Sequence, residues 1–125
     1  MTSAAPSSRR AAARSAVVDL AQARDARRLR ELGERCRAMD ECARAIVSRL
    51  FRCGSIFSRH GSRMARDLLL SHQQLLRAAA LIGRAGEADA AASDDPDALY
   101  QEASALVERS TLVVARCEAA CARSQ

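Results

Sequence analysis

The sequence lacks lysine, asparagine and tryptophan, and it holds one tyrosine and two phenylalanines among 125 residues. So few aromatic side chains leave little with which a protein could stack the bases of a single-stranded nucleic acid. No apolar run approaches the roughly 18–20 residues that cross a bilayer, so we expect no membrane span. Strand-favouring residues nowhere alternate with a period of two, which argues against a β-sheet protein.

Catalytic motifs are also missing. The sequence contains no glycine-rich phosphate loop, no paired catalytic carboxylates and no nucleophile elbow. The sequence does not point to a partner nucleophile or carboxylate for His60, so we interpret it as a structural residue. These absences predict a protein that is not an enzyme and that uses no cofactor.

Five cysteines, an odd number, do not form a disulfide framework in a chain without a secretory signal. We expect them to be reduced and the protein to be cytoplasmic. An N-terminal segment with Arg9, Arg10 and Arg14 but no acids leaves a mitochondrial alternative open, and a nuclear one also remains. Cys117 and Cys121 lie four apart and form the one weak candidate for a metal site. No zinc-family spacing supports it, and we expect no metal.

The composition is dominated by Ala, Arg and Leu, which are strong helix formers, and it predicts an all-α fold. A heptad pattern runs from residue 29 to 64, and ten of its eleven a and d positions are apolar. These positions are Leu29, Leu32, Cys36, Met39, Ala43, Ile46, Leu50, Cys53, Phe57, His60 and Met64. The apolar stripe then shifts by one residue and continues through Leu68, His72, Leu75, Ala79 and Ile82.

Glycines complicate the long helix predicted for about 19–84. Gly33, Gly54 and Gly61 share the e position of the heptad, which favours one continuous or gently hinged helix that allows a close neighbour. In the alternative, the helix breaks within 54–62 and Ser62 caps a second helix. Residues 85–95 are predicted to be a loop.

A C-terminal helix is predicted over about 96–122, because Asp95 is a good N-cap and Pro96 suits the first helical position. Two adjacent apolar stripes give this helix a wide contact face. The first stripe is Leu99, Ala103, Leu106, Ser110, Val113 and Cys117, and the second is Tyr100, Val107, Val114 and Cys121. Residues 19–84 carry fourteen Arg against seven acids, whereas 85–125 carry three Arg against eight acids. We therefore expect the C-terminal helix to pack antiparallel against about residues 57–82, in a helical hairpin, bundle or coiled coil.

The pattern predicts a flexible basic arm over 1–18 and one helical domain over 19–125. In that arrangement the C-terminal helix leaves the seam from Leu29 to Leu50 exposed, and a partner should cover it. The predicted partner interface is Leu29, Leu32, Cys36, Met39, Ile46, Leu50 and Phe57. We expect a helical subunit, adaptor or chaperone that buries a partner's amphipathic helix in a homo- or hetero-oligomer. The alternative is a nucleic-acid-associated protein that binds phosphates through its Arg-rich arm and helix.

Overall fold

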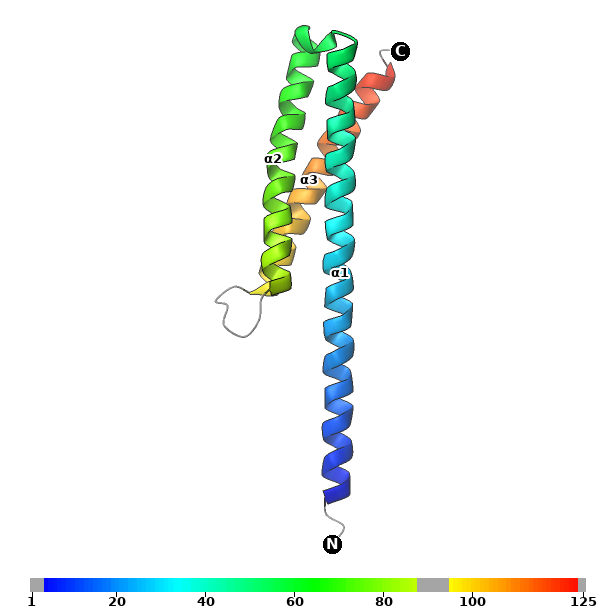
Figure 1. The fold of residues 1–125 in the computed structure, drawn as a ribbon, viewed down its shortest axis with the longest axis vertical. Helices are drawn as coiled ribbons and strands as arrows, with labels where there is room; N and C mark the ends of the chain where they lie inside the picture. Colours follow the sequence, from blue (N-terminus) through cyan, green and yellow to red (C-terminus); the bar gives the residue numbers. More distant parts are fainter. Residues whose placement is uncertain (1–3, 88–94, 124–125) are drawn as a thin grey trace.

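The computed structural model describes residues 4–87 and 95–123, and every element within those ranges is helical. The elements are α1 (Ala4–Arg52), a short 3-10 helix η1 (Ser55–Phe57), α2 (Arg59–Glu87) and α3 (Pro96–Arg123). Helix α2 runs antiparallel to both of the others, and the three form a bundle (Figure 1). The prediction of an all-α fold with an antiparallel C-terminal helix is confirmed.

The first part of α1 projects well beyond the bundle (Figure 1). Residues 4–18, for which the sequence predicted a flexible arm, continue this helix, and residues 1–3 lie outside the described ranges. All side chains from 9 to 28 are exposed. At 1.5 Å per residue, the projecting segment 4–24 is roughly 32 Å long.

The chain reverses direction between Arg52 and Arg59. Gly54 has a φ of 76°, a left-handed conformation that glycine adopts without a steric penalty, and it lies two residues after the end of α1. The Ser58 hydroxyl then accepts a hydrogen bond from the Gly61 N–H at 2.9 Å and caps α2. The favoured prediction of one helix over 19–84 is therefore wrong. The break predicted as its alternative is present, with Ser58 rather than Ser62 as the cap.

Because the chain reverses, the part of α1 from residue 29 onward packs against α2 and α3. One core cluster joins Leu32 and Cys36 to residues near the end of α2 and the start of α3. A second cluster joins Ile46 and Leu50 to Met64 and the end of α3. The expectation that this seam is exposed in a single chain is wrong, because the chain folds back and covers it.

Helix α3 begins as the sequence predicts. The backbone N–H of Asp97 donates to the Asp95 carboxylate at 3.0 Å, and Pro96 is the first helical residue. The wide apolar face meets both neighbours, with Val107 and Val114 almost completely buried. Near its start, the Arg28 guanidinium lies 4.4 Å from the Tyr100 ring centroid and links α1 to α3. The predicted loop 85–95 is shorter in the structure, since α2 continues to Glu87, and residues 88–94 lie outside the described ranges.

The inner face of α2 differs in phase from the predicted stripe. Its buried residues are Gly61, Met64, Leu68, Ser71, Leu75, Ala78, Leu81 and Ala85. His72 and Ile82 are only half-buried and Ala79 is exposed, because α1 and α3 approach α2 from two sides. Over the described residues, no helix combines the length and the apolar character needed to cross a membrane.

Candidate helix-docking face

The structure places six of the seven predicted interface residues inside the bundle. Leu32, Cys36, Ile46 and Leu50 are buried, and Leu29 and Met39 pack against the core clusters. The seventh, Phe57, lies in the turn with 84% of its surface exposed. The first six are covered by α2 and α3 and do not offer an exposed surface to a partner.

The two cysteines that formed the weak metal-site candidate lie near the C-terminal end of α3. Cys117 and Cys121 are both buried, and the Cys121 sulfur is 3.7 Å from the Met64 sulfur. No group of three or more His, Cys, Asp or Glu side chains that could hold a metal ion occurs among the described residues. None of the five cysteines, all of which lie within the described residues, forms a disulfide bond.

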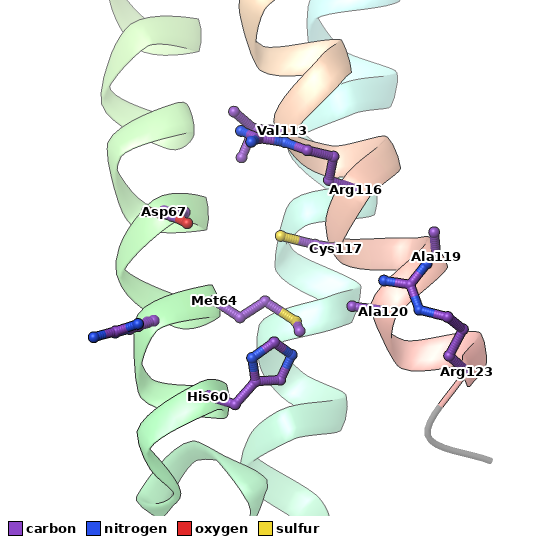
Figure 2. A pocket seen from close by; sticks show the side chains of 10 residues that line it. His60, Met64, Asp67, Val113, Arg116, Cys117, Ala119, Ala120 and Arg123 are labelled. Carbon is purple, nitrogen blue, oxygen red and sulfur yellow. The ribbon is translucent and has the colours of Figure 1, made fainter.

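A shallow groove between α2 and α3 runs beside these cysteines and has a volume of about 420 Å³. Met64 and Cys117 approach each other across it, while His60 lies near its end (Figure 2). Burial raises the pKa of the Cys117 thiol, and the charge of Asp67 adds to that effect. Burial likewise raises the pKa of the Cys36 thiol, together with Asp40. Both thiols therefore stay protonated at neutral pH and are poor nucleophiles.

Helix α2 carries a second apolar stripe, on the side that faces away from α3. Its members recur at spacings of four and three residues: Ala65, Leu69, His72, Leu76, Ala79 and Gly83. Leu69 and Leu76 are each 57% exposed, although leucines at such a spacing are typical of a helix–helix contact. The remaining positions are small except for His72, so another helix could approach this stripe closely.

Helix α1 borders the same stripe. Its Val47 is half-buried, and its Phe51 is 65% exposed on the same side of the helix. Between the two helices, one groove of about 530 Å³ is lined by Val47, Ala65 and Leu69, among others. A second of about 300 Å³ continues along Leu76 and Ala79. We call this surface the outer α1/α2 face, defined by the α2 stripe together with Val47 and Phe51.

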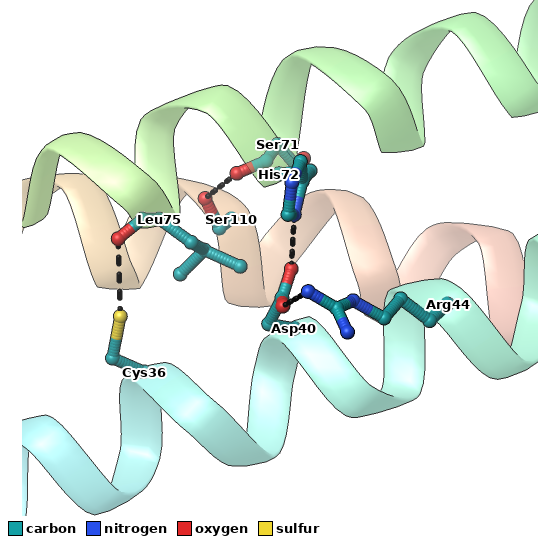
Figure 3. A network of polar contacts seen from close by, with 7 residues as sticks. All are labelled: Cys36, Asp40, Arg44, Ser71, His72, Leu75 and Ser110. Atoms are coloured by element: carbon teal, nitrogen blue, oxygen red, sulfur yellow. Dashed lines mark hydrogen bonds and ion pairs between the residues drawn. The ribbon is translucent and has the colours of Figure 1, made fainter. Parts of the chain in front are cut away.

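A polar network lies at the middle of the outer α1/α2 face (Figure 3). The carboxylate of Asp40 on α1 contacts the His72 ring nitrogen Nδ1 on α2 at 2.5 Å and the Arg44 guanidinium at 3.0 Å. Deeper in the bundle, the Cys36 thiol donates to the Leu75 carbonyl at 3.3 Å. A single polar group within an apolar helix contact fixes the register of the two helices. The network thus aligns α1 with α2 and marks the centre of the face.

The sequence contained the signal for this face, but the first apolar stripe obscured it. Leu68, Leu69 and Leu70 are consecutive, and Leu75 is followed by Leu76. The structure shows that Leu68 and Leu75 point into the bundle, and this leaves Leu69 and Leu76 as an exposed pair on another side of the helix. A helix with apolar residues on two sides is expected to contact two sets of neighbours.

The fold and this face define a class: a small three-helix bundle with a projecting N-terminal helix and one open apolar face. No protein-family model, no curated protein and no solved structure that was compared with the chain matches it.

Proposed function

We propose that the protein is a non-enzymatic interaction module, a small helical subunit or adaptor that buries an amphipathic helix on its outer α1/α2 face. The observation that carries this proposal is the second heptad-spaced stripe of α2, which a bundle of three helices leaves uncovered. A fourth helix in this groove would complete a four-helix arrangement.

The exposed leucines supply much of the driving force. Fully burying a leucine side chain stabilises a contact by about 1.5–3 kcal/mol. Leu69 and Leu76 still have over half of their surface to bury. Each therefore contributes roughly 1–2 kcal/mol on docking. The small residues along the stripe add close packing between the helices.

The reduced thiols support a cytoplasmic location as part of this proposal. The five cysteines, all among the described residues, form no disulfide, and three of them are buried in the bundle. Such thiols persist in compartments where glutathione and thioredoxin keep cysteines reduced.

Affinity purification from the native cell tests the proposal if the amounts of captured proteins are compared between wild type and variants. The double variant Leu69→Asp/Leu76→Asp places charges on the outer α1/α2 face, where a docked helix would bury them. The matched control is Leu112→Asp, since Leu112 is 67% exposed on α3, away from this face. We expect the double variant to lose the proteins that wild type and control retain, while circular dichroism shows all three equally helical. Retention of the same proteins by the double variant would contradict the proposal.

A second candidate function rests on the projecting part of α1. The projecting segment 4–24 carries four Arg against one Asp, and all four Arg side chains are exposed. Such a helix suits binding to nucleic-acid phosphates, which weakens steeply with salt. Anisotropy of a labelled DNA duplex from about 50 to 200 mM salt distinguishes the two candidates, because burial of Leu69 and Leu76 depends little on salt.

A further inference from the structure

We propose that the outer α1/α2 face docks the same face of a second copy of this chain, with a two-fold axis passing between His72 and Gln73 of α2. This inference rests on the proposed function, because it names the helix that the face buries. Four observations support it: the symmetry of the stripe, the sizes of the side chains along the face, the charges at the ends of α2 and the area of the face.

Two pairs of apolar residues on α2 are symmetric about the boundary between residues 72 and 73, and Ala80, which borders the stripe, belongs to one of them. Leu69 and Leu76 lie at equal distances on either side of the boundary between 72 and 73, and so do Ala65 and Ala80. Two copies of α2 in antiparallel contact would therefore place Leu69 of each opposite Leu76 of the other. Ala65 of each would oppose Ala80 of the other. A two-fold dimer interface requires a surface that is complementary to itself in this way.

The side chains at one end of the face are large and those at the other end are small. Phe51 and Val47 of α1 flank the end that is close to the turn, where Phe51 is 65% exposed. The opposite end presents Ala79, Ala80 and Gly83, and a Cβ atom placed on Gly83 would meet nothing within 4 Å. The two-fold axis sets the large end of one copy against the small end of the other. Phe51 of each copy would then fill the space above Gly83 of the other.

Charges at the two ends of α2 favour the antiparallel orientation. Arg59 is the first residue of α2 and Glu87 is the last, and both are exposed. The axis at 72/73 brings Glu87 of one copy next to Arg59 of the other, whereas parallel helices would place Arg59 against Arg59. Exposed ion pairs of this kind contribute little to affinity but discriminate between orientations.

The area also fits a stable dimer. The stripe from Ala65 to Gly83 is about 29 Å long, and two helices side by side are about 20 Å wide, which gives roughly 580 Å² in projection. The accessible area is larger, because the side chains make the surface uneven. Standard interfaces bury about 800 Å² from each partner. The outer α1/α2 face therefore has a projected area of the same order as one side of a standard interface.

Sedimentation equilibrium of the full chain tests the proposal. We expect a dimer at tens of micromolar protein, and we expect Leu69→Asp to weaken dimerisation at least 100-fold. Phe51→Ala should weaken it by a smaller factor, about 10-fold or more. Leu112→Asp and Phe57→Ala are the controls, since both residues are exposed off the face, and neither should change the dimer. A monomeric wild type, or a dimer that Leu69→Asp leaves intact, overturns the inference.

A cross-link locates the axis. In a Cys53→Ser background, Gln73→Cys places an exposed thiol beside the proposed axis, and a short bismaleimide should join two chains through it. Ala119→Cys, exposed on α3, is the control and should not cross-link at the same protein concentration. Equal cross-linking of both variants overturns the two-fold arrangement.

The results separate this inference from the proposed function. If wild type is monomeric and the Leu69→Asp/Leu76→Asp variant still loses its captured proteins, only the second-copy inference fails. If that double variant changes neither self-association nor capture, both fail.

Discussion

Gly61 lies in the first turn of α2, directly against the backbone of the turn that precedes it. A Cβ atom at this position would overlap the carbonyl oxygen of Ser55. The contact is with backbone, so relief would require the Gly54–Ser58 turn to move. Glycine therefore serves here to let the turn fold down onto the start of α2.

We predict that Gly61→Ala destabilises the protein by about 1–3 kcal/mol, because overpacking outweighs the higher helix propensity of alanine. Gly33→Ala is the control: it lies within α1, and a Cβ atom there would meet nothing within 4 Å. It should stabilise the protein by up to about 1 kcal/mol. Urea unfolding measures both. Equal effects of the two substitutions would show that the turn does not contact α2 closely.

The cysteines differ in their environments more than the sequence suggested. Cys53 occupies an a or d position of the heptad pattern, but it lies exposed in the turn, with its sulfur 3.1 Å from the Ser55 hydroxyl. The hydrogen bond from Ser55 lowers the pKa of the Cys53 thiol. Exposure and a larger thiolate fraction both favour reaction with electrophiles.

We predict that iodoacetamide labels Cys53 first in the folded protein, well before Cys36 and Cys117. Because its pKa is lowered, the labelling rate of Cys53 should rise at lower pH than that of an unfolded cysteine peptide. Ser55→Ala should shift that rise to higher pH. Peptide mass spectrometry after timed labelling measures each site. Labelling of Cys117 as fast as Cys53 would mean that the α2/α3 contact opens readily.

Three helix ends in this protein are set by a few residues. Gly54 follows the end of α1, Ser58 caps α2 and Asp95 caps α3. Asp95 also accepts at its backbone carbonyl a hydrogen bond from the Leu99 N–H at 3.1 Å, the first of the helix. A side-chain cap satisfies an N–H group that otherwise lacks a partner in the first turn.

We predict that Asp95→Ala destabilises the protein by about 1 kcal/mol. Asp95→Asn retains the accepting oxygen and should have a much smaller effect. Thermal unfolding monitored by circular dichroism compares the two variants with wild type. If alanine and asparagine behave alike, the charge of Asp95 matters more than its hydrogen bond to the Asp97 N–H.

The whole molecule divides into a packed bundle and a projecting helix. From Leu29 to Arg123, α1, α2 and α3 share two core clusters, whereas side chains 9–28 are exposed. An isolated helix of about 20 residues is only marginally stable in water. The bundle therefore does not depend on the projecting segment, while that segment's helicity depends on its continuity with α1.

We predict that a chain starting at Asp25 keeps its unfolding free energy within about 0.5 kcal/mol of the full chain. The truncation retains Arg28 and its contact with Tyr100. Urea unfolding measures the free energy, and size exclusion compares the self-association of the truncated and full chains. A loss of several kcal/mol would show that residues 1–24 pack against the bundle or a second copy.

Local and periodic features of this protein were readable from the sequence. Asp95 and Pro96 mark the start of α3, because a cap acts within one turn and needs no distant partner. The buried positions from Leu32 to Leu50 and the wide face of α3 follow from helical periodicity and burial. The antiparallel contact of α3 with α2 was predicted from the opposite net charges of residues 19–84 and 85–125 and from the glycines that let the chain reverse between them.

Only the tertiary structure decided where the long helical region breaks, and therefore what covers its seam. Gly54 and Gly61 each lower helix propensity by about 1 kcal/mol, too little to choose between a continuous helix and a turn. The choice depends on distant residues: the turn allows Leu32, Ile46 and Leu50 to pack on α2 and α3, which buries far more apolar surface than a rod would. The same reversal divides the apolar residues of α2 into inner and outer stripes, and it leaves Leu69 and Leu76 exposed as the candidate docking face.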